Sequence, residues 1–436
     1  MPPMRILKLT PATEKQFLGA RQSRDTEAER IAAKIIAEVR RDGDAALFAY
    51  AKKLDRLDLN SKNVWLPCTG AALLYPEARR VRPTLSGRKG STASVFLRAV
   101  QHAAKNVRAI SEKQLPRAWS LDVEPGVTIS QIVSPIDTIA CYIPGGRHAL
   151  VSTLIMTVVP AQVAGVKNIV VVCPHPNAEL RAAANFLGVK KIAQIGGAQA
   201  IAALAYGTAT IPRVEKIFGP GNRYVTAAKQ LVSSDCAIDL PAGPTEAIVL
   251  ATHANANAKW IAADLLAQAE HAPDAGSFLV ATSRSLAKKV RAEIASQLKQ
   301  LPKTNPAHAS IAQTGAILVA PSENAACEFV NRFAPEHLSL PNHSESLLRK
   351  CTSTGTIFAS PYAAQPLGDY ASGSNHVLPT AGWARRRGGL SAADFVKCIT
   401  VQQINRTGFE TLADDVQILA SAEGLQAHSN AVEVRR

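Results

Sequence analysis

Apolar residues at helical spacing characterise the N-terminal part of the chain. Within residues 25–56, Ile31, Ile35 and Val39 recur four positions apart, as on one face of an α-helix. A second stretch with the same spacing surrounds Val100. Both segments therefore predict α-helices.

A regular alternation of short apolar runs and helical runs begins at residue 137. The expected strands, three of which lead into glycine-containing turns, cover residues 137–142, 168–173, 191–195 and 214–218. The expected helices cover residues 151–165, 178–187 and 198–206, and another begins near Asn222. Strands that alternate with helices in this way predict a parallel, doubly wound α/β sheet with its Gly-rich turns along one edge.

A second alternation follows, so the sequence predicts two α/β units. Its expected strands cover residues 247–251, 277–281, 316–320 and 355–359, with helices over 285–301 and 322–333. From Ser391 onward the apolar spacing is again helical. The expected domains are an N-terminal extension (1–24), a first α/β domain (25–136 with 245–385), a second α/β domain (137–244) and a C-terminal helical tail (386–436).

Composition narrows the class of protein. A chain of 436 residues is too long for one ordinary core, and 47% hydrophobic residues is typical of a folded protein. No uncharged apolar run approaches the roughly 18 residues that span a bilayer. The seven cysteines form no CxxC pair, which argues against a disulfide framework or a thiolate zinc knuckle. Because the N-terminus also has no apolar leader, we expect a cytoplasmic protein.

The net charge of +15 comes from 49 basic and 34 acidic residues. Basic residues gather within residues 79–89 and at Arg385-Arg386-Arg387. They could form a surface for nucleic acid or another anion, or a solvated basic face. No nucleic-acid motif accompanies them, so we favour the solvated face and expect neither a nucleic-acid nor a membrane partner.

Two Gly-rich turns lie between predicted strands and helices. Gly196-Gly197 is followed by Gln199, and the other turn, residues 219–222, reads GPGN and ends at Asn222. Such turns let the backbone approach a pyrophosphate, and a helix N-terminus favours the anion. Neither turn is a full GxGxxG motif. Tight turns that need glycine only for a positive φ are the alternative reading.

Polar residues with metal-ligand chemistry end the helical run that begins at Asn257. Asp264, Gln268 and His271 are spaced to share one helix face. An amide oxygen and an imidazole one turn apart can bind one divalent metal. Alternatively, His271 only caps the helix end.

Three further segments carry candidate chemistry. The adjacent Glu336 and His337 suit acid–base catalysis near neutral pH, although such a dipeptide is usually solvated surface. Residues 368–380 form a loop dense in Gly, Asp, Asn and His. Glu423 and His428 lie close together near the C-terminus, where an exposed helix is the alternative.

Together these segments resemble the histidinol dehydrogenase family over nearly the whole chain. The motifs that carry the resemblance are YIPGG at 142–146, GGAQAIAAL at 196–204, FGPGN at 218–222, PAGPTE at 241–246, QAEH at 268–271, PEHL at 335–338, the 368–380 loop and HSNAV at 428–432. The resemblance implies two incomplete Rossmann-like domains, with small terminal extensions exchanged across a homodimer. It also implies the last step of histidine biosynthesis, a zinc-dependent four-electron oxidation of L-histidinol to L-histidine through the aldehyde, with two NAD used in succession.

The resemblance further implies the role of each residue. The zinc ligands would be Gln268, His271, Asp369 and His428. Glu336 and His337 would be the catalytic pair, with His337 taking the alcohol proton and Glu336 activating the water. The NAD contacts would be Tyr142, Gln199 and Asn222. The substrate contacts would be Thr245, Gln268, His271, His337, Asp369, His376, Glu423 and His428.

The chain departs from the common family pattern in two places. Thr245 stands where Ser is frequent, which keeps the hydroxyl, and Ala364-Gln365 replaces a common Pro-Glu. The nearest alternative function is a related zinc- and NAD-dependent dehydrogenase of another small polar alcohol. A zinc hydrolase would explain the metal ligands but not the glycine turns.

Overall fold

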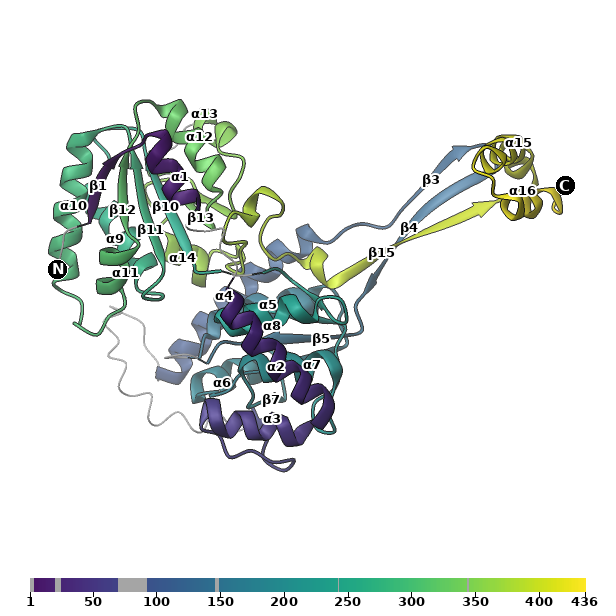
Figure 1. Cartoon of the computed structure of the whole chain (residues 1–436), viewed down its shortest axis with the longest axis horizontal. Coiled ribbons are helices and arrows are strands. Elements are labelled where there is room, and N and C mark those ends of the chain that lie inside the picture. Colours follow the sequence, from purple (N-terminus) through teal and green to yellow (C-terminus); the bar gives the residue numbers. More distant parts are fainter. Residues whose placement is uncertain (1–3, 20–24, 70–91, 146–148, 242, 343–344) are drawn as a thin grey trace.

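The computed structural model describes residues 4–19, 25–69, 92–145, 149–241, 243–342 and 345–436. Within these ranges the chain forms two helix-covered six-stranded sheets and a projecting three-stranded sheet (Figure 1). The strands of the first sheet are all parallel, and those of the second are parallel except at one edge. The predicted α/β fold with parallel sheets is therefore confirmed, while the basic cluster at 79–89 lies outside the described residues.

The first sheet has the strand order β1-β12-β11-β10-β13-β14. Its strands are β1 (Arg5–Lys8), β10 (Glu246–Ala251), β11 (Gly276–Ala281), β12 (Ala316–Val319), β13 (His337–Ser339) and β14 (Thr356–Phe358). The helices on one face are α9 (Ala258–Ala269), α10 (Arg284–Leu298) and α11 (Ala307–Gln313), and those on the other are α1 (Pro11–Gly19), α12 (Glu323–Phe333) and α13 (Glu345–Lys350). Because both faces are covered, every residue of β10 and β11 is buried. The expected N-terminal extension thus includes an edge strand of this sheet.

The second sheet has the strand order β2-β7-β6-β5-β8-β9. Its strands are β2 (Trp65–Pro67), β5 (Thr138–Tyr142), β6 (Asn168–Val172), β7 (Lys191–Ala193), β8 (Lys216–Phe218) and β9 (Ala237–Ile238). The helices on one face are α2 (Thr26–Asp42), α3 (Asp44–Tyr50), α7 (Gly197–Tyr206) and α8 (Arg223–Val232), and those on the other are α4 (Thr92–Gln114), α5 (Val151–Val163) and α6 (Ala178–Phe186). A π-helical turn, η1 (Ala51–Asp55), follows α3.

Residues 25–69 and helix α4 belong to this second unit, so their predicted place in the first domain (25–136 with 245–385) is wrong. The buried stripe of α2, which includes Ile35 and Val39, lies in the same core as residues of α7 and α8. β2 pairs with β7. The helical spacing predicted one buried face correctly, but such spacing does not say which sheet that face covers.

The C-terminal part of the chain and the hairpin of residues 119–135 together form an arm that projects from the second unit (Figure 1). The arm consists of β3 (Trp119–Glu124), β4 (Val127–Pro135) and β15 (Val396–Ile404), with α15 (Arg406–Ala422) and α16 (Gln426–Glu433) at its far end. The expected all-helical tail is wrong over β15, whose whole length pairs antiparallel with β4. Its β-branched residues and this pairing favour a strand over the helical spacing. Within the described ranges, no helix has both the length and the apolar composition needed to cross a membrane.

The segments around Glu336, the 219–222 turn and the 368–380 loop lie toward the junction of the two units. Glu336 immediately precedes β13, at the amino edge of the first sheet, whereas the 219–222 turn follows β8 at the carboxyl edge of the second. The 368–380 loop, which begins within α14 (Gln365–Tyr370), joins the units because Asn375 Nδ2 donates to the backbone oxygen of Met156 in α5 at 2.7 Å. The short 3-10 helices η4 (Trp383–Arg385) and η5 (Ala392–Phe395) then lead to the arm.

Candidate active site

Several buried polar groups converge on one carboxyl group at the amino edge of the first sheet. Thr245, the residue before β10, donates its hydroxyl hydrogen to Glu336 Oε2 at 2.5 Å. The backbone N–H of Glu246 donates to the same oxygen at 3.0 Å. Gln268, in the last turn of α9, donates from Nε2 to Thr245 Oγ1 at 2.9 Å. Residues from three separate segments are thus joined around Glu336.

Burial sets the acidity of Glu336. Loss of solvation raises the pKa of its carboxyl group to about 8, although the hydrogen bonds from Thr245 and from the Glu246 N–H stabilise the charged form. A carboxyl group with this pKa exchanges its proton near neutral pH. Glu336 is therefore suited to acid–base catalysis.

His337 presents an unpartnered imidazole beside Glu336. Neither ring nitrogen has a hydrogen-bond partner among the described residues. Nδ1 lies 3.6 Å from Glu336 Oε2, and Nε2 lies 3.8 Å from Asp369 Oδ1. Burial, with the nearby His271 and His376, lowers the pKa of His337 to about 3, so the ring is neutral. A buried polar atom without a partner costs roughly 1–3 kcal/mol, and a bound substrate group would remove that cost.

Asp369, in α14, lies between two imidazoles. Its Oδ2 is 4.0 Å from His271 Nε2, whereas its Oδ1 is the oxygen nearer His337. Burial raises the pKa of Asp369 to about 7 and lowers that of His271. The His271–Asp369 separation is slightly wider than that of two ligands of one zinc ion, each about 2.0–2.2 Å from the metal. A cation between them would stabilise the desolvated carboxylate.

His376 is held by two contacts in the same region. Its Nδ1 lies 3.0 Å from the backbone oxygen of Asp369, and its Nε2 lies 3.1 Å from Thr153 Oγ1 in α5. Burial lowers its pKa to about 4, so this ring is also neutral. The structure therefore places His376 beside Asp369, with both ring nitrogens in contact with protein oxygens.

Glu423 and His428 do not reach this cluster. Glu423 follows α15 and His428 lies in α16, and both are exposed at the far end of the arm (Figure 1). The sequence predicts that they share a site with Gln268 through exchange of the C-terminal extension across a homodimer, and a single copy of the chain leaves this a prediction. The β4–β15 pairing extends the tail away from the first sheet.

The helix that carries Gln268 is shorter than predicted. α9 ends at Ala269, so His271 follows the helix and does not continue its face. Asp264 lines a separate cavity of about 200 Å³ with Trp260 and Asn342, at the opposite edge of the sheet. The predicted shared face of Asp264 and His271 is therefore wrong.

Two residues of the cluster were not predicted. Gln365 is buried and donates from Nε2 to Gln268 Oε1 at 2.6 Å. Its spacing of four from Asp369, on one helix face, was the available signal. Thr153, the partner of His376, lies in an apolar helix where nothing in the sequence distinguishes it.

The predicted NAD contacts lie along the carboxyl edge of the second sheet. The Tyr142 hydroxyl, at the end of β5, accepts from the Gly197 N–H at 3.1 Å. Gln199 Nε2 donates to Asp55 Oδ2 at 2.9 Å, while its buried Oε1 has no partner among the described residues. Asn222 Oδ1 caps the first turn of α8 by accepting from two backbone N–H groups. All three residues therefore lie along one edge of the sheet, but the Asn222 side-chain oxygen is already hydrogen-bonded to the helix it caps.

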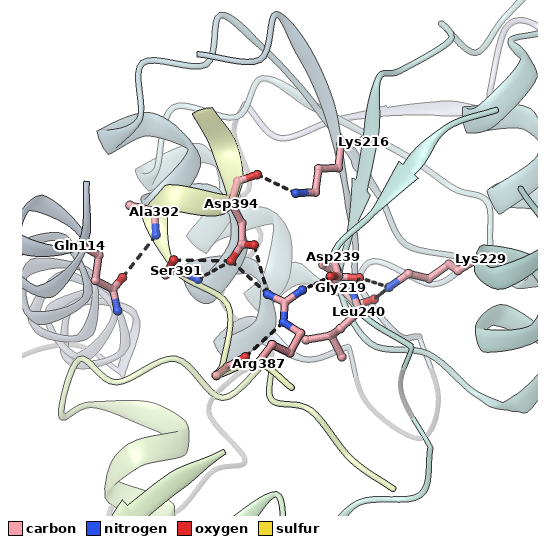
Figure 2. Close-up of polar contacts among 11 residues, drawn as sticks. Gln114, Lys216, Gly219, Lys229, Asp239, Leu240, Arg387, Ser391, Ala392 and Asp394 are labelled. Atoms are coloured by element: carbon pink, nitrogen blue, oxygen red, sulfur yellow. Dashed lines mark hydrogen bonds and ion pairs between the residues drawn. The ribbon is translucent and has the colours of Figure 1, made fainter. Parts of the chain in front are cut away.

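A buried polar network lies beneath the 219–222 turn (Figure 2). The Gly219 N–H donates to Asp239 Oδ2 at 2.7 Å, and Lys229 Nζ donates to the Gly219 oxygen at 2.8 Å and also to Asp239 Oδ1. Arg387 Nη1 donates to the backbone oxygen of Asp239, and its Nη2 lies 3.1 and 3.2 Å from the two carboxylate oxygens of Asp394. The network joins the turn to the segment that precedes the arm.

The three consecutive arginines have different surroundings. Arg385 and Arg386 are exposed, as predicted, and the Arg386 guanidinium lies 4.8 Å from the ring centre of Trp383. The prediction of a solvated side chain is wrong for Arg387, whose side chain is only 27% exposed. The sequence shows the charge of Arg387, but it does not show that the folded chain places the Asp239 carbonyl and the Asp394 carboxylate beside it.

Comparison with known proteins identifies the family. The sequence model described as histidinol dehydrogenase matches residues 19–436. A histidinol dehydrogenase of Methanosarcina mazei is 39% identical over 430 residues, and the match covers 97% of this chain and 95% of that protein. A histidinol dehydrogenase of Halalkalibacterium halodurans is 43% identical over 408 residues, and the match covers 92% of each chain. The crystal structure of histidinol dehydrogenase from Elizabethkingia anophelis matches with a TM-score of 0.89 and 34% identity, over 99% of this chain and 98% of that one. The chain therefore belongs to the histidinol dehydrogenase family of histidine biosynthesis.

Proposed function

We propose that the protein oxidises L-histidinol to L-histidine through L-histidinaldehyde, with one zinc ion per subunit and two NAD in succession. The observation that carries this proposal is the buried Glu336-His337 pair. It adjoins the amide, imidazole and carboxylate donors of Gln268, His271 and Asp369.

The donors around Asp369 fit a zinc ion. An amide oxygen, an imidazole nitrogen and a carboxylate oxygen are all zinc ligands, and one more ligand would complete a protein shell of four. Gln365 Nε2 donates to Gln268 Oε1, the proposed ligand atom, and thereby orients its amide, as residues around a metal site often orient its ligands. Burial disfavours the ionised carboxyl group of Asp369, and a bound cation would stabilise it. Among the described residues of one copy, no three His, Cys, Asp or Glu side chains form a metal site by themselves, so the proposed shell needs Gln268 and a further ligand.

The Gly-rich edge of the second sheet fits a dinucleotide. Gly219 has a φ of +113°, and a Cβ there would lie 2.1 Å from the Tyr142 backbone oxygen. The turn therefore requires glycine and brings the backbone close to the end of β5. Along the same edge, the buried Oε1 of Gln199 has no hydrogen-bond partner among the described residues, as expected of an acceptor that a ligand would engage.

The first oxidation follows from the state of His337. When bound, the zinc ion would hold the substrate in place, and NAD would accept one hydride in each oxidation. His337, whose ring nitrogens have no hydrogen-bond partner among the described residues, can take the alcohol proton as the hydride leaves the same carbon. Two electrons and two hydrogens are thereby removed, and the aldehyde forms.

The second oxidation requires water and a base. In its ionised form, Glu336 takes a proton from the water that adds to the aldehyde carbon. His337 returns the proton of the first oxidation to the aldehyde oxygen, which gives a hydrate and leaves the imidazole neutral. His337 then takes a hydroxyl proton of the hydrate while the second hydride leaves, and the carboxylic acid forms. Thr245 and the Glu246 N–H orient Glu336 for this role.

We infer that the arm completes the site of a partner subunit in a homodimer. The arm exposes large apolar side chains, among them Leu121 (57%), Ile418 (66%) and Leu419 (64%). Apolar surface of this extent favours a protein partner. A second copy would cover it and could deliver Glu423 and His428 to the site that one copy leaves incomplete.

The exchanged arm predicts complementation between two inactive variants. His337→Ala keeps a normal tail, and His428→Ala keeps a normal Glu336-His337 pair. A mixed dimer of the two has one intact site, so co-expression should restore activity that neither variant has alone. Activity of isolated mixed dimers, purified with two different tags, checks this. Mixed dimers no more active than the parents would contradict the exchange.

The pKa of Glu336 predicts the pH dependence. The base acts only when ionised, and burial raises its pKa to about 8. The turnover rate should therefore rise with pH through about 8 and be lost as the pH falls below that value. Profiles of kcat from about pH 6 to 10 test this. A flat profile across this interval would show that Glu336 does not limit turnover.

Product identification tests the proposed reaction. The protein should convert L-histidinol and NAD to L-histidine, detected by mass spectrometry, and should leave L-leucinol, which lacks the imidazole, unchanged. Oxidation of L-leucinol but not of L-histidinol would instead favour a dehydrogenase of another amino alcohol.

A further inference from the structure

We propose that Arg387 is a positioning residue for the cofactor, because it fixes through Asp239 the peptide group of Gly219 at the turn where NAD would bind. This inference rests on the proposed NAD-dependent function.

The backbone N–H and the backbone carbonyl oxygen of Gly219 are both bound by one buried ion pair. Asp239 accepts from its N–H, and Lys229 donates to its carbonyl oxygen (Figure 2). The side chains of Lys229 and Asp239 are only 2% and 0% exposed, so water does not compete for these contacts. The orientation of the turn therefore follows the position of Asp239.

Apart from the Leu240 N–H, which donates to its Oδ1 at 2.6 Å, the backbone around Asp239 is fixed mainly by one short edge strand and by Arg387. Asp239 follows β9, a strand of two residues at the edge of the sheet, and its own N–H donates to the Ile217 oxygen at 3.1 Å. Its carbonyl oxygen is bound by Arg387. A planar guanidinium can bind a carbonyl and a carboxylate together in a fixed geometry, which lysine cannot do.

Arg387 is itself held in place by the segment before the arm. Its partner Asp394 also accepts from the Ser391 N–H at 2.9 Å, and Lys216 Nζ donates to the Asp394 backbone oxygen at 2.8 Å. The next residue, Phe395, stacks on Phe218 with 4.0 Å between ring centres. Phe218 directly precedes Gly219. The segment before the arm therefore contacts the 219–222 turn in two ways, through Phe395 on Phe218 and through Arg387 on Asp239.

The inference predicts a selective loss of cofactor affinity. Without the guanidinium, Asp239 can shift, and the Gly219 peptide shifts with it. Glu336 and His337 lie on the first sheet, outside this network, and keep their geometry. The effect should therefore appear in the binding of NAD and not in the chemical steps.

The test is Arg387→Gln in the full-length enzyme. Its KM for NAD should rise roughly tenfold, as for loss of one charge-assisted hydrogen bond. Its kcat at saturating NAD and its KM for L-histidinol should stay within roughly twofold of the parent. Arg386→Gln is the matched control. It removes the same charge one residue away, outside the network, and should leave all three constants unchanged.

Direct titration with NAD, without substrate, separates this inference from the proposed function. If the parent protein does not bind NAD, the proposed function fails. If the parent binds NAD and Arg387→Gln binds it equally well, or if kcat falls as much as the affinity, the positioning role is refuted. Should Arg387→Gln not fold, Asp394→Asn is judged by the same criteria, since it keeps the side-chain shape and weakens the hold on the guanidinium.

Discussion

Glu336→Gln is expected to slow the second oxidation far more than the first. The amide keeps the shape of the carboxyl group and can still accept from Thr245, but it cannot take a proton from water. Loss of a general base typically costs about 10²–10⁴-fold in rate. In single-turnover traces the first NADH should therefore form well before the second.

His337→Ala should depress both steps, because the imidazole is assigned a proton transfer in each oxidation. L-histidinaldehyde supplied directly should be oxidised slowly by both variants. Glu345→Gln changes an exposed carboxyl group of α13 and serves as the control, with both rates retained. If Glu336→Gln blocked the first hydride transfer and oxidised supplied aldehyde normally, the assigned roles would be wrong.

Removal of the metal is expected to abolish activity, and zinc should restore it. The ligand set predicts this, since the metal would hold the substrate beside His337. His271→Asn and Asp369→Ala each remove one donor and should lower the zinc content of the purified protein, measured by elemental analysis. His308→Asn, in α11 on the first unit and outside the cluster, should keep the parent's zinc content.

The metal prediction has a clear counter-result. Full activity in a preparation shown to be free of zinc and other divalent metals would refute it. Normal zinc content in both His271→Asn and Asp369→Ala would refute the assigned ligands instead.

The sequence predicted those parts of the fold that local pattern determines. β10 and β11 are continuous buried runs and were found within one residue of their ends. The spacing of apolar residues predicted helix α2. It did not predict which sheet α2 covers, because α7 and α8, which share its core, are far away in the sequence. β15 was misassigned because its helical spacing gives no sign of the β4 partner roughly 270 residues earlier.

The candidate site shows the same limit. Glu336 and His337 stand out as an adjacent pair, and their burial, which sets their pKa values, comes only from the folded chain. Gln365 was noted as a departure from the family pattern, yet its bond to Gln268 depends on the end of α9. The sequence could not show that Glu423 and His428 lie on an arm, since the β4–β15 pairing alone holds them away.

Counting NADH per L-histidinol consumed tests the central claim most directly. Two successive hydride transfers at the Glu336-His337 site predict two NADH for each L-histidinol, with L-histidine as the product and no free aldehyde. One NADH per L-histidinol with accumulating aldehyde, or no NADH at all, would contradict the account.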